Sequence, residues 1–156
     1  MENPKNIKAG QYVVFTIQDK LSALAIEEVI EIIRMQTISN VPGVKDYIPG
    51  MINLRGKIIP VIDLHKRYNM SDLEITKKTR MVIVQNEGED IGLIVDEVTM
   101  VIDVEEKDIE QTLEMFNSLE KDCYRGFAKV NGQLIGILNI QKVLYPEYEL
   151  EVNGVE

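Results

Sequence analysis

The sequence contains little of what enzymes and metalloproteins commonly use for chemistry. Among 156 residues there is one cysteine, one histidine and no tryptophan. With Cys123 alone no disulfide can form within the chain, and a single thiol without a neighbouring histidine is more typical of core filling than of a nucleophile. With His65 alone, neither a metal site built on two histidines nor a pair of acid–base histidines is possible.

Long apolar runs and an excess of positive charge are also absent. The N-terminal stretch MENPKNIKAG lacks the apolar segment of a secretion signal, and no later run reaches the roughly 20 residues of a membrane span. We therefore expect a cytoplasmic protein with no direct membrane insertion. Seventeen Lys and Arg against 26 Asp and Glu give a net charge of −9 at pH 7, which repels phosphate backbones. We expect no nucleic-acid partner.

No motif with a clear catalytic geometry is present. Neither GxxxxGK[ST] nor GxGxxG occurs, and no acidic stretch matches a calcium loop. Asp63 stands two residues before His65, a spacing that turns side chains apart at a helix start, so we expect Asp63 to cap the helix and His65 to lie on the surface. We expect no enzyme, no cofactor and no metal. A small hydrolase that uses Asp63, His65 or Cys123 is the alternative from a different class.

What the sequence does contain is a series of short segments rich in valine and isoleucine, most of them bounded by turn residues. They predict strands at residues 12–17, 23–26, 30–33, 51–54, 57–62, 81–85, 91–95, 100–104, 127–130 and 133–138. Asn131-Gly132 is the strongest hairpin signal, because both central positions of a type I′ turn need positive φ. Capped short helices are expected at 63–68 and 139–145, and residues 106–119 fit either an amphipathic helix or a surface loop.

The chain also resembles itself. LAIEEVIEII (24–33) aligns with LIVDEVTMVI (93–102), and GKIIPVIDLHK (56–66) aligns with GQLIGILNIQK (132–142). We therefore expect two similar β units, at about 11–68 and 80–145, that support each other within one domain of residues 10–147. Strands can be exchanged between the two units. The ends, 1–9 and 148–156, are expected to be flexible.

The stretch NLRGKIIPVIDL resembles the signature of the CheW family. Five further segments lie in the order typical of that family, so the resemblance covers about residues 10–146. They are QYVVFTI, VIEII, RMVIVQ, GLIVDEVTMVI and GQLIGILNIQKVL. It implies a mainly β (all-β) fold of two packed five-stranded barrels like Src-homology 3 domains, with a groove between them. It also implies a non-catalytic, stand-alone adaptor that couples chemoreceptors (methyl-accepting chemotaxis proteins) to the histidine kinase CheA in a ternary signalling complex. Such an adaptor is recruited to receptor arrays at the inner face of the membrane, and we expect a monomer when it is free.

The same resemblance assigns two sets of residues. The receptor-binding groove comprises Val29, Ile30, Ile32, Val98 and Val101, and the kinase-binding or coupling set comprises Glu31, Gly50, Met51, Asn53, Arg55 and Gly56. A receptor helix is expected to place apolar anchors in the groove. Two alternatives stay open at this stage: the valines could be ordinary core residues, and Arg55 could hold its own turn without contacting the kinase. A regulatory β module of another signalling protein, such as a fragment of CheA or of an adaptor fused to a receiver, is a further alternative.

Overall fold

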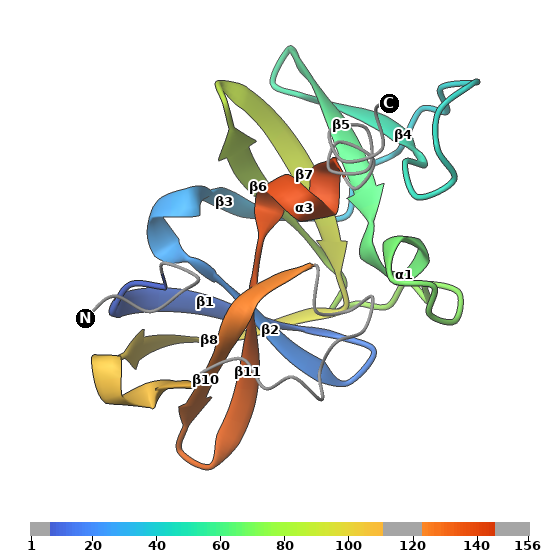
Figure 1. Cartoon of the computed structure of the whole chain (residues 1–156). Helices are drawn as coiled ribbons and strands as arrows, with labels where there is room; N and C mark the ends of the chain where they lie inside the picture. Colours follow the sequence, from blue (N-terminus) through green and yellow to red (C-terminus); the bar gives the residue numbers. More distant parts are fainter. Residues whose placement is uncertain (1–6, 111–122, 146–156) are drawn as a thin grey trace, which may run out of the picture.

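The computed structural model describes residues 7–110 and 123–145, which are mostly strands and turns (Figure 1). The strands are β1 (Gly10–Ile17), β2 (Lys20–Ala25), β3 (Val29–Arg34), β4 (Gly50–Leu54), β5 (Lys57–Asp63), β6 (Arg80–Asn86), β7 (Glu89–Val95), β8 (Glu97–Val104), β9 (Ile109–Glu110), β10 (Tyr124–Val130) and β11 (Gln133–Leu138). Short helices are α1 (Leu64–Arg67) and α3 (Ile140–Leu144), and 3-10 turns are η1 (Ile26–Glu28) and η2 (Glu106–Asp108). Each predicted strand is present, and the mainly β class is confirmed.

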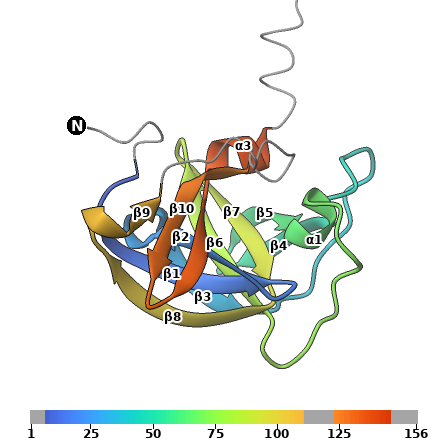
Figure 2. The same ribbon diagram turned by 60° about the horizontal axis from the view of Figure 1, so that its bottom comes forward.

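The strands form two sheets, and each sheet combines strands from both repeat units (Figures 1 and 2). Sheet A has the order β8-β1-β2-β11-β10-β9, and sheet B has the order β3-β6-β7-β5-β4. The first unit therefore contributes β1 and β2 to sheet A and β3, β4 and β5 to sheet B. Sheet A exceeds the expected five strands only by β9, which is two residues long.

The pairing register follows the sequence repeat. Tyr12 lies opposite Ala25 in β1 and β2, and the equivalent residues Met81 and Ile94 lie opposite each other in β6 and β7. The parallel pairs are equivalent as well: β5 pairs with β7, and β11 pairs with β2. The two sheets thus share one pattern. The first two strands of each unit lie in one sheet, and the third strand, β3 or β8, lies in the other sheet.

Three clusters of buried side chains hold the sheets together. One lies within sheet A around Val14 and Ile135, and another within sheet B around Ile52 and Ile83. The largest contains residues of both sheets together with side chains of α1 and α3. We call this third cluster the seam core; it is made of Phe15, Ile17, Leu24, Ile62, Leu64, Val82, Val84, Ile91, Leu93, Val95, Cys123, Tyr124, Leu138, Ile140, Val143 and Leu144. We call the region where the two sheets meet the seam. These side chains fill it, so the seam is closed.

Local predictions of turns and caps are confirmed. Asn131 and Gly132 have φ of 52° and 79°, the left-handed pair that a type I′ turn needs. The Asp63 carboxylate accepts backbone N–H bonds from His65 (3.0 Å) and Lys66 (3.3 Å) at the start of α1. The Asn139 side chain accepts the N–H of Lys142 at 3.3 Å in α3. These caps satisfy N–H groups that have no partner within a helix.

Arg67 ties the two equivalent helices together. From the last turn of α1 its Nε donates to the carbonyl of Val143 and its Nη2 to that of Lys142, each at 2.8 Å, in α3. The guanidinium also lies over the Tyr47 ring, 5.6 Å from its centroid. A cation at the C-terminal carbonyls of a helix is favourable. The contact fixes α3, which follows β11 of sheet A, against α1, which follows β5 of sheet B.

One sequence-based expectation is wrong in the described residues. His65 is buried, with 5% of its surface exposed, because its ring bonds to Asp96 of the β7–β8 connection and to the carbonyl of Ser71. The segment 106–119 was open between an amphipathic helix and a surface loop, and its described part, residues 106–110, forms the 3-10 turn η2 and the strand β9, in which Ile109 pairs with Ala128 of β10. The rest of the segment 106–119 lies outside the described residues, as do residues 1–6 and 148–156 of the expected flexible ends. Ile7, by contrast, is buried.

Candidate functional site

The turn between β4 and β5 carries the most distinctive part of the sequence motif. Arg55 and Gly56 occupy its two central positions with φ of 52° and 83°. The Asn53 Oδ1 accepts the N–H of Gly56 at 2.9 Å, so Asn53 closes the turn. Because Asn53 makes this bond, the Arg55 side chain is not needed to close the turn and extends away from it.

Arg55 forms an ion pair across sheet B. Its Nη2 donates to the Oε2 of Glu31 on β3. β3 and β4 are the two edge strands of sheet B, so this contact requires the sheet to curl until its edges approach. The Arg55 side chain is 68% exposed, and an exposed pair of this kind stabilises a fold by only about 0–1 kcal/mol.

A second ion pair, which was not predicted from the sequence, lies near the same end of sheet B. The Nζ of Lys57, at the start of β5, is 2.7 Å from the Oδ2 of Asp90, near the start of β7. Lys57 directly follows Gly56 within the motif, so its place in the motif was the available signal. The Asp90 side chain is 11% exposed, which makes this pair the better shielded of the two.

Gly50 and Met51 lie where β4 meets the preceding connection. Ser39 and Met51 exchange two backbone hydrogen bonds of 2.8 and 2.9 Å. A Cβ atom on Gly50 would lie 1.9 Å from the Ser39 carbonyl oxygen, so only glycine allows this approach. Gly50 is buried and supports β4 and the β4–β5 turn through its backbone, whereas Met51 is half-buried.

Four of the five residues assigned to the receptor groove face the seam. On β3, Val29 lies opposite Val84 and Ile32 lies opposite Val82, and both of those partners belong to the seam core. A bulge between Val29 and Glu31 brings Val29 and Ile32 to the same face. Opposed residues on adjacent strands point to the same side, so this face of β3 continues the seam core.

β8 repeats this arrangement on sheet A. Val98 lies opposite Phe15 of the seam core, and Val101 lies opposite Val13, two residues before Phe15 on the same face of β1. In the sequence repeat Val98 is equivalent to Val29, and Val101 is equivalent to Ile32. β3 and β8 therefore carry matching apolar stripes, one on an edge strand of each sheet.

Burial divides each stripe into an inner and an outer residue. Val29 and Val98 pack against the seam core and are half-buried. Ile32 is 40% exposed and Val101 is 53% exposed. Ile30, at the bulge of β3, is 46% exposed. We call Val29, Ile32, Val98 and Val101 the seam surface; its inner pair belongs partly to the core, and its outer pair is available to another molecule.

Glu31 faces the opposite side of β3 from the seam surface. It lies opposite Ile83, which belongs to the core within sheet B, and its carboxylate meets Arg55. One strand thus presents Ile32 on one face and the Glu31–Arg55 pair on the other. On β3, alternation therefore separates Val29 and Ile32 of the receptor set from Glu31 of the kinase set.

The burial of Glu28, directly before β3, raises the pKa of its carboxyl above the usual value. The nearby guanidinium of Arg125, 3.9 Å away, and the N–H of Ala25, which the carboxylate accepts at 3.2 Å, lower this pKa and only partly oppose the effect of burial. Burial likewise raises the pKa of the Tyr68 hydroxyl well above its ordinary range, because that hydroxyl lies inside the molecule near Tyr124 and Cys123.

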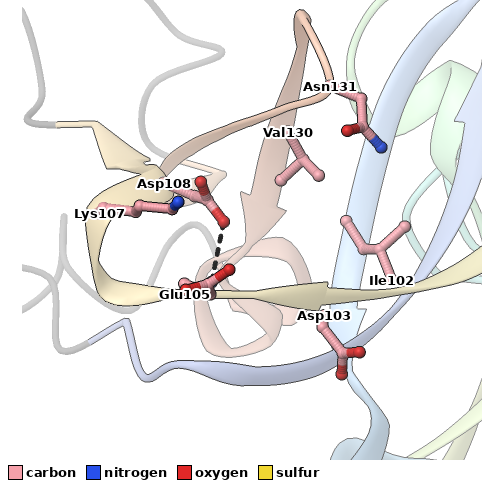
Figure 3. A pocket seen from close by; sticks show the side chains of 7 residues that line it. All are labelled: Ile102, Asp103, Glu105, Lys107, Asp108, Val130 and Asn131. Carbon is pink, nitrogen blue, oxygen red and sulfur yellow. Dashed lines mark hydrogen bonds between the residues drawn. The ribbon is translucent and has the colours of Figure 1, made fainter.

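A hollow of about 400 Å³ lies where the β10–β11 turn meets β8 and η2 (Figure 3). Its lining side chains are Ile102, Asp103, Glu105, Lys107, Asp108, Val130 and Asn131. Asp108 already accepts the N–H of Glu105 at 2.9 Å. Asn131 is the repeat equivalent of Arg55.

The residues considered for catalysis are committed to structural contacts. Asp63 caps α1, the His65 ring bonds to Asp96, and Cys123 is buried in the seam core. Within residues 7–110 and 123–145, no group of three or more His, Cys, Asp or Glu side chains could hold a metal ion. In the same residues no helix is long and apolar enough to cross a membrane.

Comparisons with known proteins agree with this arrangement. The profile of the CheW-like domain matches residues 11–147. The chain is 38% identical over 142 residues to the chemotaxis protein CheW of Bacillus subtilis (strain 168), covering 90% of this chain and 91% of the relative. It is 28% identical over 143 residues to the chemotaxis protein CheW of Helicobacter pylori, covering 92% and 86%. The crystal structure of the scaffolding protein TtCheW from Thermoanaerobacter tengcongensis superimposes with a TM-score of 0.80 and 35% identity, covering 87% of this chain and 92% of that one.

Proposed function

From the premise that the chain belongs to the CheW-like family of chemotaxis scaffolding proteins, we propose that it couples chemoreceptors to the histidine kinase CheA. It does so without catalysis, by binding both partners in one signalling complex. The observation that carries the proposal is the division of β3, whose two faces present the seam surface and the Glu31–Arg55 pair. Two partners can therefore be bound by neighbouring residues without competing for one side chain.

The seam surface is the proposed receptor site. Ile32 and Val101 are exposed apolar side chains on edge strands, and Ile30 adds a third beside them. Such residues suit the apolar anchors of an amphipathic helix, which is the form of a receptor's cytoplasmic coiled coil. Burying about 50 Å² more of apolar surface at each position contributes roughly 1.3 kcal/mol. Val29 and Val98 give the site a fixed apolar base.

The β4–β5 turn is the proposed kinase site. Arg55 is its exposed charged residue, and arginine is enriched among residues that dominate binding energy at interfaces. Glu31 orients the guanidinium, and Asn53, Gly56 and Gly50 hold the turn and its strand in place. Met51 adds a half-buried apolar contact beside them. The partner here is the regulatory domain of CheA, bound in the cytoplasm at receptor arrays by an adaptor that is monomeric when free.

Reconstitution tests this function. Purified chain, CheA and a receptor signalling fragment are mixed, and autophosphorylation of CheA is followed with and without the chain. The expected result is that receptor control of CheA appears only when all three components are present. CheA activity that responds equally to the receptor fragment without the chain would contradict the proposal.

A further inference from the structure

Asp96 lies at the point where the chain leaves sheet B and enters sheet A. It directly follows β7 and directly precedes β8. Its backbone N–H donates to the carbonyl of Thr16 at 3.0 Å, and its Oδ2 accepts the N–H of Gln18 at 2.6 Å. Both partners belong to β1 and the turn after it, in sheet A. Asp96 thus anchors the start of β8 on its new sheet.

His65 holds the same carboxylate from the other sheet. It belongs to α1, which follows β5 of sheet B, and its Nε2 lies 2.9 and 3.0 Å from the two oxygens of Asp96. Its Nδ1 lies 2.9 Å from the carbonyl oxygen of Ser71. The His65 side chain is 6% exposed and that of Asp96 is 27% exposed. A hydrogen bond to a charged group is worth more in such a partly shielded place than on an open surface.

The other crossing between the sheets is built differently. In the sequence repeat Asp96 corresponds to Glu27 and His65 corresponds to Gln141, and both of these residues are exposed. There the chain passes from β2 to β3 through η1, a 3-10 turn. The contact between His65 and Asp96 therefore belongs to the start of β8 and has no counterpart in the described residues at the start of β3.

We propose that His65 is a positioning residue for the seam surface. Through Asp96 it fixes the start of β8, and Val98 follows only two residues later, with Val101 on the same face. The inference rests on the proposed receptor site, and it assigns His65 to the receptor side of the adaptor. The hydrogen bonds described for His65 and Asp96 do not reach the β4–β5 turn, where the proposed kinase site lies.

Two substitutions separate this role from general stability. The amide nitrogen of Gln extends about as far as Nε2 of the imidazole, so His65→Gln retains a donor for Asp96. The amide nitrogen of Asn extends only as far as Nδ1, so His65→Asn retains a donor for Ser71 and loses the one for Asp96. Both variants remove the ring and each keeps the donor that the other loses, so a larger effect at β8 in His65→Asn than in His65→Gln reports on the contact with Asp96.

The first measurement needs no partner. Hydrogen exchange is measured in the free protein, and His65→Asn is expected to speed exchange of the β8 amides about tenfold relative to His65→Gln, the factor that corresponds to losing one charged hydrogen bond. Amides of β4 and β5 are expected to exchange alike in the two variants. Equal exchange in β8, or acceleration of both sheets by the same factor, would overturn the proposal.

The second measurement uses the partners. His65→Asn is expected to bind a receptor signalling fragment about tenfold more weakly than His65→Gln does, while both bind the CheA regulatory domain alike. Equal loss of affinity for both partners would overturn the assignment to the receptor side. If the unaltered chain does not bind the receptor fragment, the proposed function fails, whereas the exchange result still decides whether His65 positions β8.

Discussion

Arg55 and Glu31 join the two edge strands of sheet B through one ion pair. The guanidinium comes from the β4–β5 turn and the carboxylate from β3, at opposite ends of the strand order. Both residues belong to the set that the sequence motif connected with kinase coupling. Since they are in contact, a change at either one alters the position of the other, and single substitutions cannot separate their roles.

Arg55→Glu is expected to weaken binding of the CheA regulatory domain by about tenfold or more, because a charge contact with that domain is lost and a repulsive one is created. Folding is expected to change by no more than about 1 kcal/mol, because the Arg55 side chain is 68% exposed. Isothermal titration and urea denaturation provide the two measurements.

The matched control exchanges the charges, in the double variant Glu31→Arg with Arg55→Glu. It allows an ion pair between β3 and the turn but removes the positive charge from the tip of the turn. If Arg55 contacts the kinase, the double variant binds as weakly as Arg55→Glu. Restored binding in the double variant would show that only the internal pair matters.

Gly50→Ala tests the close approach of the Ser39 backbone to β4. A Cβ at this position would lie 1.9 Å from a backbone oxygen, so the segment at Ser39 and β4 must separate, and a loss of about 3 kcal/mol or more in unfolding free energy is expected. Gly43→Ala is the control, because Gly43 also has positive φ, 85°, but has open space around it. Its expected loss is about 1 kcal/mol. Equal losses in urea denaturation would refute this account of Gly50.

Glu28→Gln is expected to change how stability depends on pH. Burial raises the pKa of this carboxyl in the folded protein, so the folded state binds the proton more tightly than the unfolded state does. Stability therefore falls as pH rises from the ordinary value of 4.5 through the raised value, and the loss persists above it. The glutamine keeps an acceptor for the N–H of Ala25 but cannot ionise, so its stability curve lacks this fall.

Urea denaturation at a series of pH values from about 4 to about 7 measures this difference. Glu27→Gln, on the exposed side of the same 3-10 turn, removes an equal charge and serves as the control. Unfolding free energies of Glu28→Gln and the unaltered chain that run parallel over the whole range would contradict the assignment.

Local features of the fold could be predicted because local signals determine them. Valine and isoleucine segments located the strands, and Asp63 and Asn139 located both capped helices. The repeat indicated two similar units and agrees with the pairing registers. It could not indicate that β3 and β8 change sheets, because sequence similarity between segments does not determine which segments pair.

Contacts between distant residues were beyond local patterns. His65 was expected on the surface, and its actual partner, Asp96, lies 31 residues further along the chain. Ile109 has the spacing of a helical residue, but pairing with Ala128 in β10 makes it part of a strand. The exposure of the seam-surface residues could not be predicted either. Alternation in a strand shows which residues share a face but not which of them other parts of the molecule cover. The structure places Val29 and Val98 partly in the core and leaves Ile32 and Val101 exposed.

The seam surface is proposed to bind the receptor independently of the kinase site, and the decisive measurement is the titration of a receptor signalling fragment against Val101→Asp. Leu134→Asp is the control, because Leu134 is exposed to a similar degree, 49% against 53%, on β11. We predict that Val101→Asp loses about tenfold or more in receptor affinity while its affinity for the CheA regulatory domain stays within about twofold, and that Leu134→Asp keeps its receptor affinity. Unchanged receptor affinity in a folded Val101→Asp variant would contradict the claim.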